Sequence, residues 1–226
     1  MRRLIFTIVG CLVLASVGSA APPPAIQRLR GTVDSITATT LTLKTNDGRT
    51  LSVALPADTK FLGVTKSTLE SVTDGVFIGT ATKGVHPPIA LEVLIFPEAM
   101  RGTGEGHYDW DEITDATEGG VKTVQSTMTN GTIKATSQTT VKSTMTNGTV
   151  KSGLTADGSK MLTVTFGDGK SIDITVPPTA PIVTVAVTDA SVVKIGAKVF
   201  VVTAVDGDRF DAKRVFVGQD GLTPPM

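Results

Sequence analysis

The sequence has few of the side chains that most often carry chemistry in proteins. Cysteine occurs once, at Cys11, and histidine twice, at His86 and His107. Tyrosine and tryptophan also occur once each, at Tyr108 and Trp110. If a signal peptide that contains Cys11 is removed, the remaining chain has no thiol, which excludes disulfides, thiolate catalysis and thiolate metal ligands. Nucleophile–base pairs have few candidates in such a chain, so we expect a non-catalytic protein.

The sequence also lacks a net charge and, after its first twenty residues, a long apolar run. Its 21 basic residues balance its 21 acidic residues, so no overall positive field attracts a polyanion, and we expect no nucleic-acid partner. No later segment has the roughly 20 apolar residues that a membrane-spanning helix needs. Amphipathic helical stripes are absent while Val, Ile and Thr are abundant, which favours an all-β fold.

The N-terminus has the pattern of a cleavable secretory signal. Arg2 and Arg3 precede an apolar run, residues 4–17, that ends in small residues up to Ala20. The run is too short to span a bilayer, and small residues are what a signal peptidase accepts, so we expect cleavage after Ala20 and a periplasmic or secreted protein. A second interpretation treats residues 8–11 as a lipobox, with Cys11 as a lipid-modified residue.

Two parts of the chain repeat one pattern. The matching stretches are offset by 121 residues: Leu41-Thr42-Leu43, Asp47-Gly48-Arg49 and Leu55-Pro56 recur as Leu162-Thr163-Val164, Asp168-Gly169-Lys170 and Val176-Pro177. The same spacing relates Phe61 to Ile182 and Gly75 to Gly196. Upstream, Gly31-Thr32-Val33 matches Gly148-Thr149-Val150 if a few residues are inserted. An ungapped series of this length indicates an internal duplication.

Each copy is predicted to form a small barrel. In the first copy, alternating apolar and polar residues predict strands at 26–37 and 40–45, followed by a hairpin turn at Asn46-Asp47-Gly48. A further strand, a short helical stretch near Ser67–Val72 and two strands, 76–82 and 89–96, complete the order of an OB-type barrel. The second copy predicts strands at 148–154, 161–166, 170–176, 197–205 and 209–217. We therefore expect an all-β chain of two tandem small OB-like barrels with an irregular acidic connecting segment: signal peptide 1–20, barrel 25–97, acidic glycine- and aromatic-rich loop 98–120, threonine- and lysine-rich repeat segment 121–147, barrel 148–218 and C-terminal tail 219–226.

These motifs resemble a known kind of protein. The pattern of Gly31-Thr32-Val33, Leu41-Thr42-Leu43 and Asp47-Gly48-Arg49 resembles an OB-like domain of unknown function found in exported bacterial proteins. Residues 97–108, Ser143-Thr144-Met145-Thr146-Asn147 and residues 220–226 are similar to a family of small secreted proteins, mostly proteobacterial, without an established activity. Some members carry the label "metal ABC transporter permease", which this chain contradicts because a permease needs several spanning helices. The chain departs from the family in holding an extra copy of Ser-Thr-Met-Thr-Asn.

The segment that joins the two copies is the place where a site is expected. Residues 97–120 contain seven acidic residues against one basic residue, Arg101, together with Tyr108, Trp110 and one histidine. In an extended strand, residues 107, 109 and 111 project to one side. An imidazole and two carboxylates suit zinc, manganese or nickel. The residues of this predicted divalent-metal site are His107, Asp109 and Asp111, completed by Glu105 or Glu112 and joined by His86 if its loop converges on the site.

The alternative interpretation gives the same segment no metal. Tyr108 and Trp110 then anchor a long loop onto a barrel, where they are candidate ligand-binding residues, and the acids stay solvated or pair with the lysines that follow. The stretch Ser126–Lys134 recurs 17 residues later as Ser143–Lys151, and its Asn-Gly dipeptide predicts a hairpin or a duplicated first strand for the second barrel.

The function expected from the sequence is that of an exported binding or scaffolding protein with an unknown ligand. Because the two large polar aromatic side chains lie among acids, a protein or a small neutral or cationic ligand is expected, and no cofactor. Two alternatives stay open: a periplasmic divalent-metal carrier that uses residues 105–112, and a hydrolase in which a carboxylate pair such as Glu105 and Asp111 acts as acid and base.

Overall fold

The computed structural model describes residues 24–120, 122–137 and 158–226, and this part of the chain is all-β, as the sequence predicted. Its helical residues form four 3₁₀ turns, Leu69–Ser71, Glu98–Met100, Ala116–Glu118 and Ala190–Val192. The strands are β1 (Ala25–Ile36), β2 (Thr40–Thr45), β3 (Thr50–Ala54), β4 (Lys60–Lys66), β5 (Phe77–Lys83), β6 (Ile89–Ala90), β7 (Val93–Ile95), β8 (Gly106–Thr114), β9 (Thr123–Ser137), β10 (Lys160–Phe166), β11 (Lys170–Val176), β12 (Ile182–Thr188), β13 (Lys198–Asp206) and β14 (Arg209–Gly218). No helix in the described ranges is long and apolar enough to cross a membrane.

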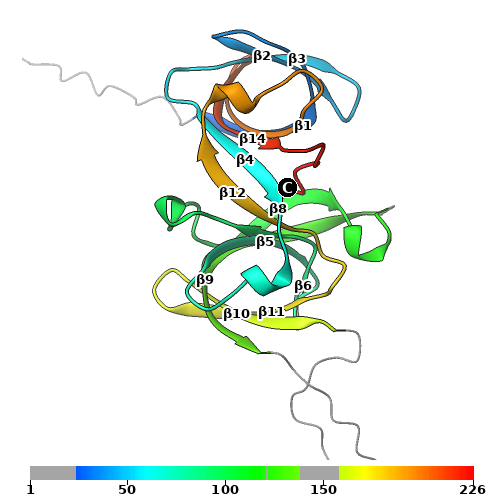
Figure 1. Ribbon diagram of the computed structural model, residues 1–226, viewed down its shortest axis with the longest axis vertical. Helices are drawn as coiled ribbons and strands as arrows, with labels where there is room; N and C mark the ends of the chain where they lie inside the picture. The colour runs from blue at the N-terminus through cyan, green and yellow to red at the C-terminus, as the bar shows by residue number, and fades with distance from the viewer. Residues whose placement is uncertain (1–23, 121, 138–157) are drawn as a thin grey trace, which may run out of the picture.

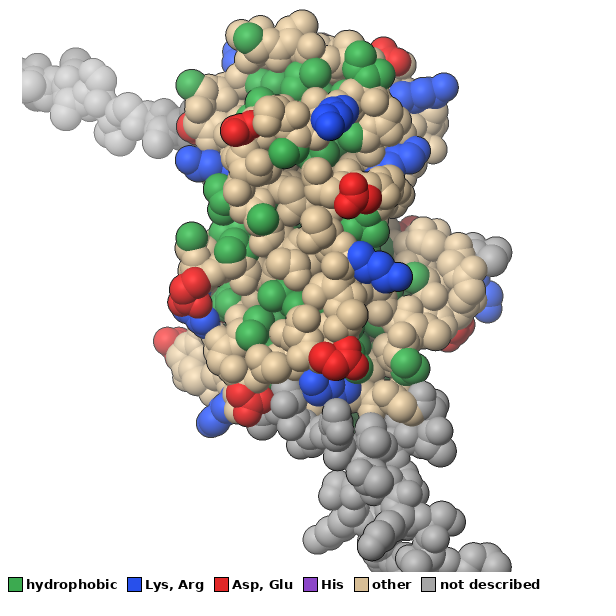
Figure 2. All heavy atoms as spheres, in the orientation of Figure 1, with side chains coloured by type: hydrophobic (Ala, Val, Ile, Leu, Met, Phe, Trp, Pro, Cys, Tyr) green, Lys and Arg blue, Asp and Glu red, His purple; other side chains and the backbone are tan. Residues whose placement is uncertain are grey.

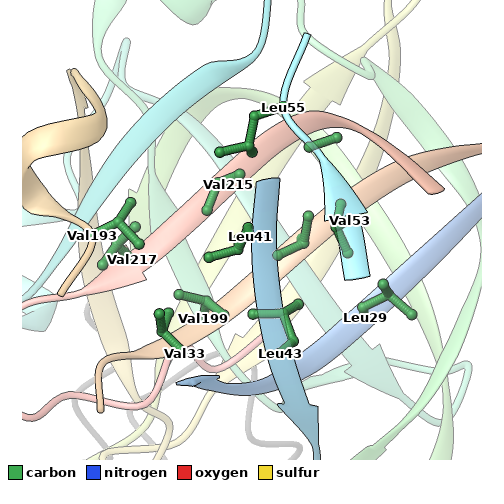
Figure 3. Packing of buried hydrophobic residues seen from close by; sticks show 12 residues of the cluster. Leu29, Val33, Leu41, Leu43, Val53, Leu55, Val193, Val199, Val215 and Val217 are labelled. Atoms are coloured by element: carbon green, nitrogen blue, oxygen red, sulfur yellow. The ribbon is translucent and has the colours of Figure 1, made fainter. Parts of the chain in front are cut away.

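Five strands of the sheet form a closed circuit of pairings. The order β13-β1-β2-β3-β14 closes because β14 also pairs with β13. Alternate residues of these strands point inward and form one apolar core, which Figure 3 shows from close by. On β1, Leu29 and Val33 point into this core, whereas Arg28 and Arg30 lie on the opposite face. The period of two along β1 therefore separates a core face from a face that is free for another role.

A second circuit of pairings has the same plan. Strands β9, β10, β11, β6 and β5 follow one another, and β5 pairs with β9 to close the series. Its core contains Ile78, Ile133, Leu162, Val164 and Ile174, all nearly fully buried. Figure 1 shows the two circuits as two lobes stacked along the long axis of the molecule.

Each circuit takes its strands from both copies of the repeat. Strand β3 of the first copy pairs with β14 of the second, and β11 of the second copy pairs with β6 of the first. The pairings therefore do not follow the expected boundaries, in which residues 25–97 and 148–218 each close a barrel. The reason is a pair of strands that the sequence prediction missed, β4 and β12, which carry the chain from one circuit to the other (Figure 1).

The pairing of β4 with β12 relates the two copies by a two-fold symmetry. These strands are antiparallel, and Val64 lies opposite Val185, its own equivalent in the repeat. The remaining pairings repeat on both sides: β14 runs parallel to β4 as β7 runs parallel to β12. An antiparallel pair centred on equivalent residues has a local two-fold axis between its strands. The copies thus exchange their last strands across this axis.

The first strand of the second copy is β9, which contains Gly131-Thr132-Ile133. Ile133 pairs with Val164 as Val33 pairs with Leu43, and both pairings have an irregularity at the next residues. Of the two alternatives for Asn130-Gly131, a hairpin or a strand, the strand is observed, because β9 continues through this dipeptide with paired strands on both sides. The predicted strand 148–154 and the repeat 143–151 lie outside the described residues, as does the signal peptide.

The acidic segment 98–120 is more regular than predicted. It contains strand β8, which pairs with β9, between two 3₁₀ turns. The apolar side chains of this strand explain its order, because Ile113 belongs to one small core and Tyr108 and Trp110 pack against that core. The short helical stretch after β4 is a 3₁₀ turn whose N-cap is Thr68, without a side-chain capping bond. The C-terminal tail folds back between the two circuits and buries Met226.

Candidate functional site: a cavity between the two circuits

A β-bulge in β8 sets the directions of its side chains. The register with β9 shifts between Asp109 and Glu112, so that Trp110 and Asp111 stand opposite one residue, Ser126. The Ser126 hydroxyl donates to the backbone carbonyl of Asp111 at 2.7 Å. Residues 107 and 109 therefore follow the alternation of a regular strand, but residue 111 does not.

The two aromatic side chains of β8 line a cavity of about 500 Å³ between the two circuits. Tyr108 and Trp110 meet edge to face, with ring centroids 6.0 Å apart. Further apolar walls come from β7 and its flank, from β13 and from β14: Leu94, Phe96, Phe200 and Phe216. A volume of this size suits a small organic ligand. The candidate ligand-binding residues of the sequence analysis thus lie side by side at a cavity.

Polar groups hold the rim of this cavity on one side. The amide nitrogen of Asn130 donates to the Gly104 carbonyl at 2.9 Å and to the Tyr108 hydroxyl oxygen at 3.0 Å. The Tyr108 hydroxyl donates to the same carbonyl. Burial raises the pKa of Tyr108, which keeps its hydroxyl protonated. The indole nitrogen of Trp110 is buried with no hydrogen-bond partner among the described residues.

Two arginines of β1 hold the carboxylate that the bulge redirects. Arg28 and Arg30 each donate to one oxygen of Asp111 at 2.8 Å. The guanidinium of Arg28 also lies over the Trp110 ring, 3.7 Å from its centroid. This network fixes Trp110 in the cavity wall, because the arginine that stacks on the indole is itself held by a carboxylate.

The charged side chains that line the cavity among the described residues have one sign. Arg28, Lys60, Lys213 and Arg214 line it, and no acidic side chain does so among the described residues. Four of the seven acids of the 98–120 segment form ion pairs: Asp111 with the two arginines, Asp115 and Glu118 with Lys83, and Glu98 with Arg101. The sequence analysis allowed these acids either to stay solvated or to pair with the lysines that follow. None of the partners is such a lysine, and Asp109 and Glu112 are exposed.

The residues of the predicted metal site do not gather in the described part of the chain. Nδ1 of His107 lies 2.8 Å from the Thr129 hydroxyl, and its ring stacks on Phe166. Asp109 is exposed, and a Glu105 carboxylate oxygen accepts from the Gly167 backbone amide at 3.0 Å. His86 is exposed in the loop after β5. The described residues contain no group of three or more potential ligands close enough to hold a metal ion.

The arginines and phenylalanines of the cavity were missed by the sequence analysis. The signal for Arg28 and Arg30 was present, since they alternate with Leu29 and Gly31 along a predicted strand. In the sequence, Phe200 and Phe216 could not be distinguished from ordinary core residues. Only the crossing of β4 and β12 brings them beside β1 and β8. Their place at a cavity follows from the exchange of strands.

The fold and the site define a β-sheet protein with an apolar, cation-rimmed cavity between two closed circuits of strands. Comparisons with known proteins add no relative: the chain matches no family model, no curated protein and no solved structure.

Proposed function

We propose that this chain is a non-catalytic, exported binding protein, and that it holds a small ligand with an apolar body and an anionic group. In this proposal the two circuits are OB-like barrels, each built from strands of both copies, and the ligand lies in the cavity between them. Export rests on the predicted signal peptide.

The single observation that carries the proposal is the combination of apolar walls with cations of one sign. Aromatic and aliphatic side chains from both circuits supply the walls, and four basic side chains surround them without an Asp or Glu side chain in the lining, within the described ranges. An apolar ligand body gains about 25 cal/mol for each Å² that it removes from water. An anionic group gains charge-assisted hydrogen bonds from lysine or arginine.

This proposal changes the ligand charge expected from the sequence. A neutral or cationic ligand was expected because Tyr108 and Trp110 lie among acids in the chain. In space, Asp111, the acid that follows Trp110, is neutralised by Arg28 and Arg30, and Asp109 is exposed and does not line the cavity. Lys213 and Arg214 of β14 lie far from the segment in sequence and line the cavity. The local charge in three dimensions is therefore opposite to the local charge along the chain.

The experiment uses Trp110 as the reporter, since it is the sole tryptophan. Decanoate is titrated into the purified protein and compared with 1-decanol, which has the same chain without the charge. We expect decanoate to change the Trp110 emission and to bind at least tenfold more tightly than decanol. In Lys213→Gln and Arg214→Gln the affinity for decanoate falls and that for decanol stays.

Lys198→Gln serves as the control, because Lys198 lies on β13 but does not line this cavity. Equal affinities for decanoate and decanol in the unchanged protein would contradict the anionic ligand. No emission change with either compound would contradict the cavity as the binding site. The metal-carrier and hydrolase alternatives stay predictions: zinc, nickel, manganese and copper titrations followed by Trp110 emission test the first, and a substrate panel tests the second.

A further inference from the structure

A second cavity of about 450 Å³ lies next to the first, and Met226 lines both. It is formed by β1, by the residues around β6 and β7, by β8 and by the C-terminal tail. Its charged side chains, among the described residues that line it, are Arg30, Glu92 and Glu112. The proposed function does not use this cavity.

Two polar atoms at this cavity lack partners in the described part of the chain. Glu92 is 1% exposed, and its Oε1 atom has no hydrogen-bond partner. Nη2 of Arg30 is also buried and without a partner, while Nη1 is held by Asp111. Burial raises the pKa of Glu92 well above its usual range, against the opposing charge of Arg30. Unpaired buried polar groups of this kind cost several kcal/mol, so each is a candidate contact for a ligand.

The internal repeat relates some lining positions of this cavity to lining positions of the first. Val93 pairs with Ile182, and Val215 pairs with Phe61, which is the equivalent of Ile182 in the repeat. Val93 and Val215 are therefore equivalent, and so are the residues before them, Glu92 and Arg214. By the same register Leu91 replaces Lys213. At the positions where the first cavity has two cationic side chains, the second cavity therefore has an aliphatic side chain and a buried acid. The duplication has produced two related cavities with different charge.

We propose that the second cavity binds a small zwitterion of the α-amino acid class with an apolar side chain. Its ammonium group donates to Oε1 of Glu92, and its carboxylate accepts from Nη2 of Arg30. Both unpaired atoms are then satisfied by one molecule. The apolar side chain contacts Leu91, Ile113 and Pro181, which line the same cavity. Asp111 orients the guanidinium of Arg30 before the ligand arrives.

The test compares L-leucine with two analogues by isothermal titration calorimetry. 3-Methylbutylamine lacks the carboxylate, and 4-methylpentanoate lacks the ammonium group. We expect leucine to bind at least tenfold more tightly than either, a difference of at least about 1.4 kcal/mol. The 4-methylpentanoate titration is repeated in excess decanoate, which separates entry into the first cavity from entry into the second. Absence of leucine binding at millimolar concentration, or equal affinities for all three compounds, would overturn the proposal.

Two variants locate the site. Glu92→Gln is expected to weaken leucine binding at least tenfold, while Glu112→Gln changes it less than twofold, because Glu112 is exposed at the same cavity. Leucine binding should also release protons from Glu92, measured as a difference in heat between buffers of different protonation enthalpy. Unchanged affinity or unchanged proton release in Glu92→Gln would overturn the assignment of Glu92.

Discussion

The two cavities share equivalent positions of a duplicated chain in part of their linings, and at these positions they differ in charge. Lys213 and Arg214 line the first cavity, and Leu91 and Glu92 hold the same positions at the second. Strand β1 contributes Arg30 to the second cavity, whereas the equivalent residue on β9, Asn130, lines the first. The fold therefore keeps the pairing scheme in both halves while the side chains outside the circuits change freely.

The positions that stay alike are those that point into the circuits. Val33 and Ile133 are equivalent and buried, and so are Leu43 and Val164. Inward positions of a closed sheet must be apolar in both copies because they exclude water, whereas outward positions carry no such requirement. The comparison separates residues that specify the fold from those that specify ligands.

The largest expected effect tests whether β1 and β9 are true equivalents. A Cβ atom at Gly31 would clash with the backbone carbonyl oxygen of Lys44, and one at Gly131 with that of Thr165. Neither backbone can move without breaking strand pairs. We expect Gly31→Ala and Gly131→Ala each to lower the free energy of unfolding by about 3 kcal/mol, at the upper end of overpacking costs, measured by urea denaturation.

Gly63→Ala is the matched control for these variants. An added Cβ there would contact only side-chain atoms of Gln219 and Thr188, at 3.9 to 4.0 Å. Its effect should stay within about 1 kcal/mol. A large loss in Gly31→Ala together with none in Gly131→Ala would show that the two strands are not equivalent.

The next effect separates Glu92 from its equivalent, Arg214. Because the folded-state pKa of Glu92 is raised, the folded protein keeps a proton that the unfolded chain loses above its ordinary value of 4.5. Wild-type stability therefore falls as pH rises from about 4.5 towards the raised pKa, with a slope of up to about 1.4 kcal/mol per pH unit. Glu92→Gln should remove this slope, measured by urea denaturation from pH 4 to 8. Arg214→Gln should leave the slope in place, since a guanidinium does not titrate in this pH range. Parallel plots of stability against pH for wild type and Glu92→Gln would contradict a buried, titrating carboxyl.

Much of the fold could be predicted from the sequence, but not which strands pair. The prediction of strands at 161–166, 170–176 and 209–217 is confirmed, and each end of these strands differs by no more than one residue. Strands β4 and β12 were missed because both bury consecutive residues, such as Leu62-Gly63-Val64 and Ile182-Val183, so the alternation that predicts a strand is weak in them. The exchange itself leaves no trace in sequence: β3 buries the same apolar face against a strand of either copy, so periodicity cannot choose between the two partners.

The site could be predicted in part. Tyr108 and Trp110 were identified because they are the only residues of their types, and both line the first cavity. The metal prediction assumed unbroken alternation from residue 107 to residue 111, and a bulge cannot be located without the partner strand. Arg28 and Arg214 join the site only through the exchanged strands, and spacing along the chain contains no record of that.

A smaller effect tests the ion pairs that only the second circuit has. Lys83 of β5 donates to Asp115 and Glu118, whereas its equivalent in the first circuit is Ala204. Burial of Asp115 opposes its ionisation, yet hydrogen bonds from Lys83 and Thr117 hold its pKa below the usual value. Lys83→Met leaves this 1% exposed carboxylate without its cation and should cost about 1–2 kcal/mol at pH 7, less than a fully buried pair because Lys83 is partly solvated. The loss should shrink as pH falls through the lowered pKa of Asp115; a loss that does not depend on pH would assign it to packing instead.

The smallest effect compares the two hairpin turns that first revealed the duplication. Asp47 accepts from the hydroxyl of Thr45 and from the guanidinium of Arg49, and these bonds hold its pKa well below the usual value. At the second turn the equivalent of Thr45 is Phe166, which has no hydroxyl to donate to Asp168. Asp47→Asn should therefore lower the melting temperature slightly at pH 7, and Asp168→Asn should lower it less.

The difference between the two variants should vanish in acid. A carboxylate with a lowered pKa stabilises the fold above its unfolded-state pKa and loses that contribution as pH falls through its folded-state pKa. The difference should also shrink in 1 M salt, because the turn is exposed and its ion pair is screened. Equal melting temperatures for the two variants at low salt would mean that the turns hold their shape through backbone hydrogen bonds and glycine alone.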